Sequence, residues 1–131
     1  MYEIFVRSQF SAAHYLRNYP GNCERPHGHN WTVEVSVRSS GLDDLGMAVD
    51  FRVVKKSLRE VLSELDHTDL NELEYFREKN PSSESIAAYI YSRLKPFFGG
   101  KGYFLHRVTV GETPDTGVHY WEEQIDPADS L

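Results

Sequence analysis

Cysteine is nearly absent from this chain, which has one cysteine among its 131 residues. A single cysteine cannot form an internal disulfide, so we expect a reducing, cytoplasmic environment and a thiol free for other roles. Long apolar runs are missing too, and the first residues alternate charged and apolar side chains, unlike a membrane span or a signal peptide. We therefore expect no membrane partner.

Positive charge is also scarce, because 14 Lys and Arg residues stand against 20 Asp and Glu residues, giving a formal net charge of −6. Nucleic-acid binding depends on clustered Lys and Arg side chains that contact phosphates, so we expect no nucleic-acid partner. The apolar content of 40% is that of a globular protein. The length favours one domain over residues 1–131.

Apolar and polar side chains alternate in residues 2–10 and 27–38, which predicts two strands with one largely apolar face each. If the first strand continues with the same alternation, His14 lies on that apolar face. His27 and His29 share the parity of the apolar residues in the second strand. Because the two strands are expected to pair antiparallel, His14 should come close to the other two histidines.

Two amphipathic helices are predicted in the middle of the chain. The first follows Asp50, which suits the N-cap position. Its apolar stripe comprises Phe51, Val54, Leu58, Val61, Leu62 and Leu65. The second follows Ser82 or Ser83 as its cap. Its stripe comprises Ile86, Ala87, Ile90, Leu94 and Phe97. Two further strands are predicted at residues 103–112 and 117–123, on either side of a turn.

The order strand-strand-helix-helix-strand-strand predicts an α+β fold, with an antiparallel sheet of four strands and both helices packed on one of its faces. Such a sheet has two edges, and an exposed edge invites pairing with another chain. We therefore expect a homo-oligomer.

Three histidines with an open fourth position are the usual arrangement of a catalytic zinc ion, so His14, His27 and His29 are candidate metal ligands. Imidazole also binds copper, nickel and iron, which makes zinc a preference rather than a necessity. Two other interpretations stay open. The histidines can be ordinary core residues, or they can hold a structural zinc that a fourth protein ligand closes.

Four other residues carry candidate chemistry. Cys23 lies in a polar segment, where a nearby cation or histidine would lower its pKa and make the thiolate available; otherwise it is a small buried residue. In Asp66-His67, a carboxylate can orient an imidazole for proton transfer, or the pair can complement the end of a helix. Glu112, on the apolar face of its strand, can bind a guanidine-like pair of N–H groups or be a solvated strand end.

These residues match a known family. The chain resembles the 6-pyruvoyl-tetrahydropterin synthase family and, within it, the bacterial 6-carboxy-tetrahydropterin synthases of queuosine biosynthesis. The segments that carry the resemblance are, in order, Phe10-Ser11-Ala12-Ala13-His14, Cys23-x-x-x-His27-Gly28-His29, Val49-Asp50-Phe51, Leu65-Asp66-His67-x-x-Leu70-Asn71, Asn80-Pro81-Ser82-Ser83-Glu84 and Glu112-Thr113. The gap of three residues between Cys23 and His27 is similar to that of the bacterial subgroup.

The resemblance implies the tunnelling fold (T-fold), whose subunits have the same order of strands and helices. In that family, trimers close their sheets into a barrel and two trimers commonly stack into a hexamer. Active sites lie between subunits, so a trimer or hexamer is implied here.

The resemblance also assigns roles to residues. His14, His27 and His29 would hold Zn²⁺. The residues implied in proton transfer are Cys23 as the general base, with Asp66 and His67 from a neighbouring subunit completing the relay. Glu112 would bind the 2-amino and N3–H groups of a pterin ring. The residues implied to assist it are Ser82, Ser83 and Glu84.

The implied reaction converts 7,8-dihydroneopterin triphosphate into 6-carboxy-5,6,7,8-tetrahydropterin, acetaldehyde and triphosphate. Glu24 complicates this assignment, because it stands three residues before His27 and resembles the carboxylate base of paralogues that make 6-hydroxymethyl-7,8-dihydropterin for folate. Cys23 and Glu24 together therefore leave a dual or folate-type activity open. Synthesis of 6-pyruvoyl-tetrahydropterin and a non-catalytic scaffold that binds metal or pterin stay open as well.

Overall fold

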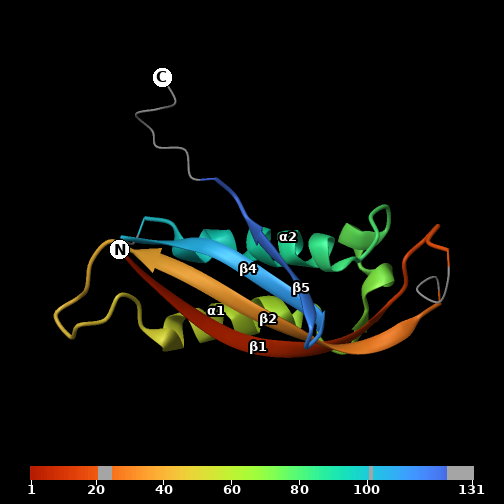
Figure 1. Ribbon diagram of the computed structural model, residues 1–131, viewed down its shortest axis with the longest axis horizontal. Coiled ribbons are helices and arrows are strands. Elements are labelled where there is room, and N and C mark those ends of the chain that lie inside the picture. Colours follow the sequence, from red (N-terminus) through yellow and green to blue (C-terminus); the bar gives the residue numbers. More distant parts are fainter. Residues whose placement is uncertain (21–24, 101, 124–131) are drawn as a thin grey trace, which may run out of the picture.

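The computed structural model describes residues 1–20, 25–100 and 102–123. Its strands form a five-stranded sheet in the order β3-β1-β2-β4-β5, and α1 and α2 lie on the same face of that sheet (Figure 1). The elements in chain order are β1 (Tyr2–His14), β2 (His27–Ser39), α1 (Phe51–Ser63), β3 (Thr68–Asp69), α2 (Ser83–Leu94), β4 (Tyr103–Thr113) and β5 (Thr116–Trp121). The predicted α+β class and order of elements are confirmed.

The two long strands β1 and β2 position the functional residues. They pair antiparallel along their whole length, from Tyr2 opposite Ser39 to His14 opposite His27. β1 thus continues beyond the alternating segment seen in the sequence and carries its parity as far as His14, as predicted.

The fifth strand, β3, was not predicted. It pairs in parallel with Ala12 and Ala13 of β1. Its two residues are too few to show any alternation of apolar and polar side chains, and the pairing depends on a strand far away in the sequence. The prediction of four strands was therefore wrong, because the sheet has β3 as a fifth, short edge strand.

Both helices begin at the predicted caps. The Asp50 side chain accepts a hydrogen bond from the Arg52 amide at 2.9 Å, and the Ser82 hydroxyl accepts one from the Ser85 amide at 3.2 Å. These bonds satisfy amides in the first turn that have no partner within the helix. Ser82, rather than Ser83, is therefore the cap of α2.

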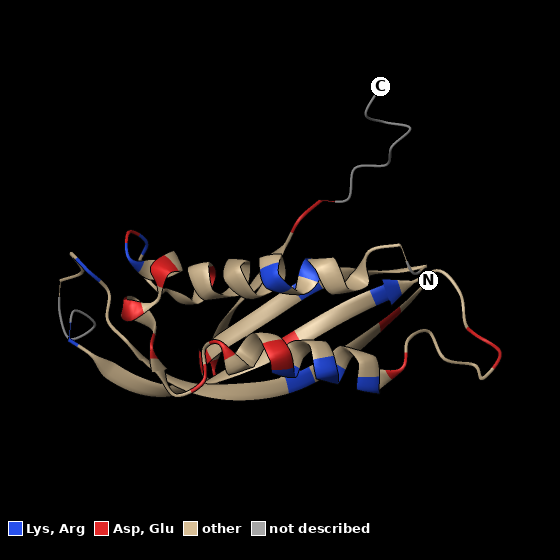
Figure 2. Ribbon diagram, turned by 180° about the vertical axis from the view of Figure 1, so that it is seen from behind, with Lys and Arg blue, Asp and Glu red and all other residues tan. Residues whose placement is uncertain are grey.

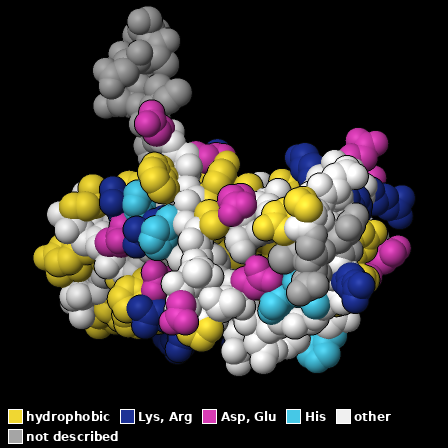
Figure 3. Space-filling model, turned by 45° about the vertical axis from the view of Figure 1, so that its right-hand side comes forward, with side chains coloured by type: hydrophobic (Ala, Val, Ile, Leu, Met, Phe, Trp, Pro, Cys, Tyr) yellow, Lys and Arg dark blue, Asp and Glu magenta, His cyan; other side chains and the backbone are white. Residues whose placement is uncertain are grey.

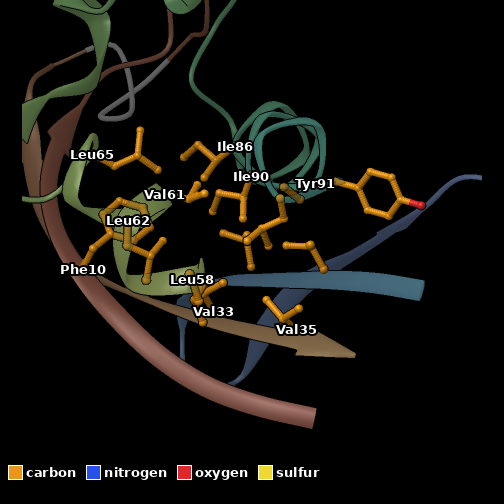
Figure 4. Close-up of a cluster of buried hydrophobic side chains, with 14 of the residues drawn as sticks. Phe10, Val33, Val35, Leu58, Val61, Leu62, Leu65, Ile86, Ile90 and Tyr91 are labelled. Atoms are coloured by element: carbon orange, nitrogen blue, oxygen red, sulfur yellow. The ribbon is translucent and has the colours of Figure 1, made fainter. Parts of the chain in front are cut away.

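The core lies between the two helices and the sheet face that they cover, where apolar side chains from both layers meet (Figure 4). The predicted stripes are buried except at their ends, where Phe51 is 53% exposed and Phe97 is 37% exposed. Phe51 is the first residue of α1, one turn before its buried stripe begins. Phe97 lies in a 3-10 helix, Lys95–Phe98, whose tighter winding turns Phe98 into the core instead.

Exposed positions of α1 and α2 include both basic and acidic residues (Figure 2). One ion pair links the helices, since the Arg93 guanidinium of α2 contacts Glu64 just after α1 at 2.7 Å. Within the described residues, none of the helices has the length and apolar character needed to span a membrane.

Candidate metal centre

Three imidazoles and a carboxylate converge where β1 ends and β2 begins. His14 is the last residue of β1, His27 faces it as the first residue of β2, and His29 lies two residues further along the same face. Glu112 comes from the end of β4, the other neighbour of β2. The ligand atoms of all four side chains lie within 4.8 Å of one another.

Trp31 separates this cluster from the apolar core. Its ring centroid lies 4.8 Å from that of His14 and 5.5 Å from that of His29, with the rings edge to face. The indole N–H donates a hydrogen bond to the Ala12 carbonyl at 3.3 Å, which holds the ring in place. His14 itself is only 2% exposed. Trp31 therefore packs against the buried side of the cluster, while His27, His29 and Glu112 remain partly exposed.

The Glu112 carboxylate meets all three imidazoles through one oxygen. Oε1 lies 3.2 Å from His14 Nε2 and 3.4 Å from His27 Nε2, and it also contacts His29 Nε2. The last contact lacks hydrogen-bond geometry, so the buried His29 Nε2 has no hydrogen-bond partner among the described residues. A buried nitrogen of this kind calls for a ligand.

Main-chain carbonyls orient two of the imidazoles from behind. His14 Nδ1 lies 2.8 Å from the Pro81 carbonyl oxygen, and His27 Nδ1 lies 2.8 Å from that of Arg25. A carbonyl only accepts hydrogen bonds, so each Nδ1 carries the proton and donates, which leaves Nε2 of a neutral ring with a lone pair. Histidines that bind metals are held in this way.

The electrostatics of the cluster favour the protonation states that bind metals. Burial lowers the pKa of His29, an effect that His27 and His14 reinforce and Glu112 opposes. Burial alone would raise the pKa of Glu112, but the influence of the neighbouring His29, followed by His14 and His27, outweighs it, so this pKa lies below its usual range. Both shifts favour a neutral His29 beside an ionised Glu112.

A bound cation would accept the lone pairs that these side chains point toward one another. Neutral imidazole nitrogens with a carboxylate oxygen suit zinc and other divalent transition metals better than magnesium or calcium, which prefer oxygen ligands alone. The three predicted ligands thus come together as expected, and the residues fit a metal ion. Glu112 joins them in the structure, which sequence reasoning did not foresee.

The Asp66-His67 pair forms, but outside the imidazole cluster. Asp66 Oδ2 lies 3.0 Å from His67 Nδ1, and the His67 side chain is 82% exposed. The Ser11 amide donates to Asp66 Oδ1 at 2.9 Å, and the Ser11 carbonyl accepts from the His67 amide at 2.6 Å. The Ser11 hydrogen bond, followed by that from His67, holds the pKa of Asp66 below its usual range. Asp66 is therefore an ionised partner for an exposed imidazole.

An open hollow of about 390 Å³ lies beside the His67 ring. His29 and His67 both line it, and Ser11, Gly28 and Asn30 contribute to its wall. The space-filling view shows histidine side chains beside acidic ones at the surface (Figure 3).

The predicted substrate-binding residues at the start of α2 lie beside the centre. Ser82, Ser83 and Glu84 directly follow Pro81, whose carbonyl holds His14. Cys23 and Glu24 fall outside the described residues, so their roles stay predictions. The Pro81 contact was missed because it joins a main-chain carbonyl to a side chain 67 residues away, for which the sequence has no signal.

The comparisons with known proteins all indicate the same family. The family model described as 6-pyruvoyl tetrahydropterin synthase matches residues 3–123. The chain is 36% identical to a 6-carboxy-5,6,7,8-tetrahydropterin synthase of Synechocystis, over 97% of this chain and 98% of that protein. It is 39% identical to a putative 6-carboxy-5,6,7,8-tetrahydropterin synthase of Archaeoglobus fulgidus, over 86% of this chain and 89% of that one.

Solved structures give the same result for the fold. The chain is similar to Caenorhabditis elegans 6-pyruvoyl tetrahydropterin synthase, with a TM-score of 0.83 and 29% identity over 93% of this chain and 96% of the other. It is also similar to the synthase from Plasmodium vivax, with a TM-score of 0.70 and 26% identity over 92% and 98% of the two chains.

Proposed function

Because the chain belongs to the 6-pyruvoyl tetrahydropterin synthase family, we propose that this enzyme is a zinc-dependent 6-carboxy-5,6,7,8-tetrahydropterin synthase. The substrate is 7,8-dihydroneopterin triphosphate, and the products are 6-carboxy-5,6,7,8-tetrahydropterin, acetaldehyde and triphosphate. The names of the Synechocystis and Archaeoglobus relatives support this reaction. The observation that carries the proposal is the convergence of three imidazoles with the Glu112 carboxylate, whose ligand atoms all lie within 4.8 Å of one another.

His14, His27 and His29 hold the ion in this proposal. When bound, zinc supplies Lewis acidity toward the oxygen atoms of the substrate's side chain. The protein's contribution is orientation: the carbonyls of Pro81 and Arg25 fix two of the rings. Trp31 packs edge to face against His14 and supports its ring.

Glu112 binds the pterin ring in this proposal, accepting hydrogen bonds from its 2-amino and N3–H groups. The lowered pKa of Glu112 supports this role, because only the ionised carboxylate accepts two such bonds side by side. Ring binding requires the carboxylate to turn away from the imidazoles. Ser82, Ser83 and Glu84, next to Pro81, assist in holding the ring.

Cys23 removes a proton from the side chain of the substrate, and Asp66 and His67 relay it. We place the Asp66-His67 pair in the active site of a neighbouring subunit. The outward exposure of the His67 ring supports that placement, since it can serve a site beyond its own chain. A cytoplasmic trimer or hexamer provides such a neighbour.

The test is incubation of the zinc-loaded protein with 7,8-dihydroneopterin triphosphate, followed by mass spectrometry of the products. The expected product is 6-carboxy-5,6,7,8-tetrahydropterin, lost in a triple variant with His14, His27 and His29 changed to alanine. Full turnover by metal-free protein would refute the proposal. A 6-pyruvoyl product would assign the other activity of the family, and no product at any metal loading would favour a binding scaffold.

A second candidate is a dual or folate-type activity, because Glu24 stands three residues before His27. It yields 6-hydroxymethyl-7,8-dihydropterin with the carboxylate as base. Comparing Cys23→Ala with Glu24→Ala separates the two activities. Hydroxymethyl product that survives Cys23→Ala and disappears in Glu24→Ala supports dual function, and its absence from every variant rejects it.

A further inference from the structure

The main chain beyond β1 is held by two asparagine side chains. The Asn71 carboxamide accepts from the Tyr15 amide at 2.9 Å and donates to the Tyr15 carbonyl at 3.1 Å. Asn80 does the same for Arg17, accepting from its amide at 2.8 Å and donating to its carbonyl at 3.1 Å. Each carboxamide thus occupies both hydrogen-bonding groups of one residue.

This pattern reproduces the pairing of a neighbouring strand. Residues two apart in an extended chain present their N–H and C=O groups to the same side; Tyr15 and Arg17 have this spacing just beyond β1, although Arg17 already lies in a turn. The strand β3 pairs with Ala12 and Ala13 on the same edge. After β3 the chain enters a 3-10 helix, Leu70–Glu72, and no longer pairs with the β1 segment through its main chain. From there the Asn71 side chain makes the corresponding hydrogen bonds.

Asn80 also acts on His14 through its neighbour in the chain. Pro81 follows it, and the Pro81 carbonyl accepts the hydrogen bond from His14 Nδ1. The dipeptide Asn80-Pro81 therefore holds the main chain three residues after His14 and the imidazole of His14 itself. Moving one of these contacts shifts the other.

The two asparagine segments are tied together. Arg17 Nη1 donates to the Lys79 carbonyl at 3.1 Å, and Nη2 lies 3.4 Å from the Asn71 carbonyl oxygen. Asn71 is 4% exposed, so its hydrogen bonds are shielded from water. The result is a fixed connection between the residues that follow His14 and those that precede α2.

We propose that Asn71 and Asn80 are positioning residues of the metal centre. They fix the main chain directly after His14. As a result, Nδ1 of His14 donates to the Pro81 carbonyl, and Nε2 of His14 faces the other ligands. This inference rests on the proposed function, because it presupposes a metal bound by the three histidines. The competing explanation is that both asparagines contribute only to folding stability.

The isosteric variants Asn71→Asp and Asn80→Asp separate the two explanations. Each keeps the oxygen that accepts from the amide of Tyr15 or Arg17, but sets a second oxygen against the carbonyl. Zinc affinity is measured by competition with a chromophoric chelator. We expect each variant to bind zinc about 10- to 100-fold more weakly than the wild type, as for other residues that orient metal ligands.

The matched control is Val37→Ala, a buried position near the other end of β2, opposite Ile4. It lowers the thermal unfolding midpoint by opening a cavity, and its zinc affinity should equal that of the wild type. A second readout is amide hydrogen exchange at Tyr15 and Arg17, which should accelerate in the matching variant. Where Asn71→Asp does not fold, Asn80→Ala gives the same comparison without a new charge.

Wild-type zinc affinity in both aspartate variants would overturn the inference. So would an equal loss of affinity in Val37→Ala, because stability alone would then explain it. If the wild type itself binds no zinc, the proposed metal site fails together with this inference, an outcome that the wild-type titration alone identifies. Weaker zinc binding in the asparagine variants, with unchanged binding in Val37→Ala, supports the inference.

Discussion

At the scale of single residues, the proton on Nδ1 decides what the cluster can hold. The carbonyls behind His14 and His27 fix that proton, so the two Nε2 atoms can accept but not donate. The site is thus prepared for a cation by two main-chain oxygens that themselves touch no metal.

Removing one ligand should show this preparation directly. We expect wild-type protein to bind about one zinc ion per chain and His27→Ala to lose most of that affinity, because two imidazoles rarely hold zinc alone. Atomic absorption after dialysis against a weak chelator measures the content. An exposed histidine outside the cluster, His119, provides the control, and His119→Ala should keep its zinc.

Glu112 touches the imidazoles in this structure, yet its proposed task is ring binding. Glu112→Gln should keep most of its zinc, because three imidazoles suffice, but should raise KM strongly, since an amide cannot accept two N–H groups side by side. Zinc content and steady-state kinetics on the same preparation check this. Loss of zinc with unchanged KM would instead make Glu112 a metal ligand.

At the scale of elements, α1 and α2 are joined by a small polar network. The Tyr89 hydroxyl of α2 donates to Glu64, which follows α1 and also pairs with Arg93. Burial, followed by the hydrogen bond to Glu64, raises the pKa of Tyr89 to about 12. Tyr89 therefore stays a neutral donor far into the alkaline range.

This network predicts a dependence of stability on alkaline pH. Because the folded pKa of Tyr89 is raised, its contribution is complete below the ordinary value of 10.0 and is lost as pH rises toward about 12. Tyr89→Phe should lower the free energy of unfolding by about 1–2 kcal/mol at neutral pH and reduce this alkaline loss. Urea denaturation at several pH values measures both, and an alkaline loss that is identical in Tyr89→Phe would contradict the assignment.

How far the sequence predicts these elements depends on how local their signals are. Alternation in residues 2–10 and 27–38 extends along rigid strands, which is why it placed His14, His27 and His29 correctly. The two residues of β3 carry no such pattern. Phe97 was misplaced because the sequence does not show where α2 tightens into a 3-10 helix. Contacts such as Pro81 with His14 depend on the packing of distant elements, which no local pattern contains.

At the scale of the whole molecule, the described helices α1 and α2 cover the same face of the sheet, and no described helix covers the other (Figure 1). Cross-strand ion pairs lie on β1 and β2, with Arg38 against Glu3 and Arg7 against Glu34, each at 2.7 Å. They are direct partners in the register of the two strands, with the opposite parity to the core residues. A face that carries such ion pairs suits contact with water better than a dry interface.

If the active site is shared between subunits, two inactive variants should complement each other. His29→Ala lacks a metal ligand and His67→Ala lacks the relay, so each alone should be inactive. Mixed oligomers, refolded together, should regain turnover, because some sites combine an intact metal centre with an intact His67. Each variant refolded alone is the control. Mixtures that stay inactive while forming oligomers would place both residues in one subunit.

The left-handed backbone of His67, with a φ of 58°, has a practical consequence for protein engineering. A side chain in this region raises the energy of the folded state by roughly 1–2 kcal/mol, and glycine escapes that strain. His67→Gly should therefore raise the melting temperature, or at least leave it unchanged, while turnover is lost. A clear drop in melting temperature would mean that the backbone is not strained at this position. A search for thermostable variants that ignores turnover would be drawn toward substitutions that inactivate the enzyme at this position.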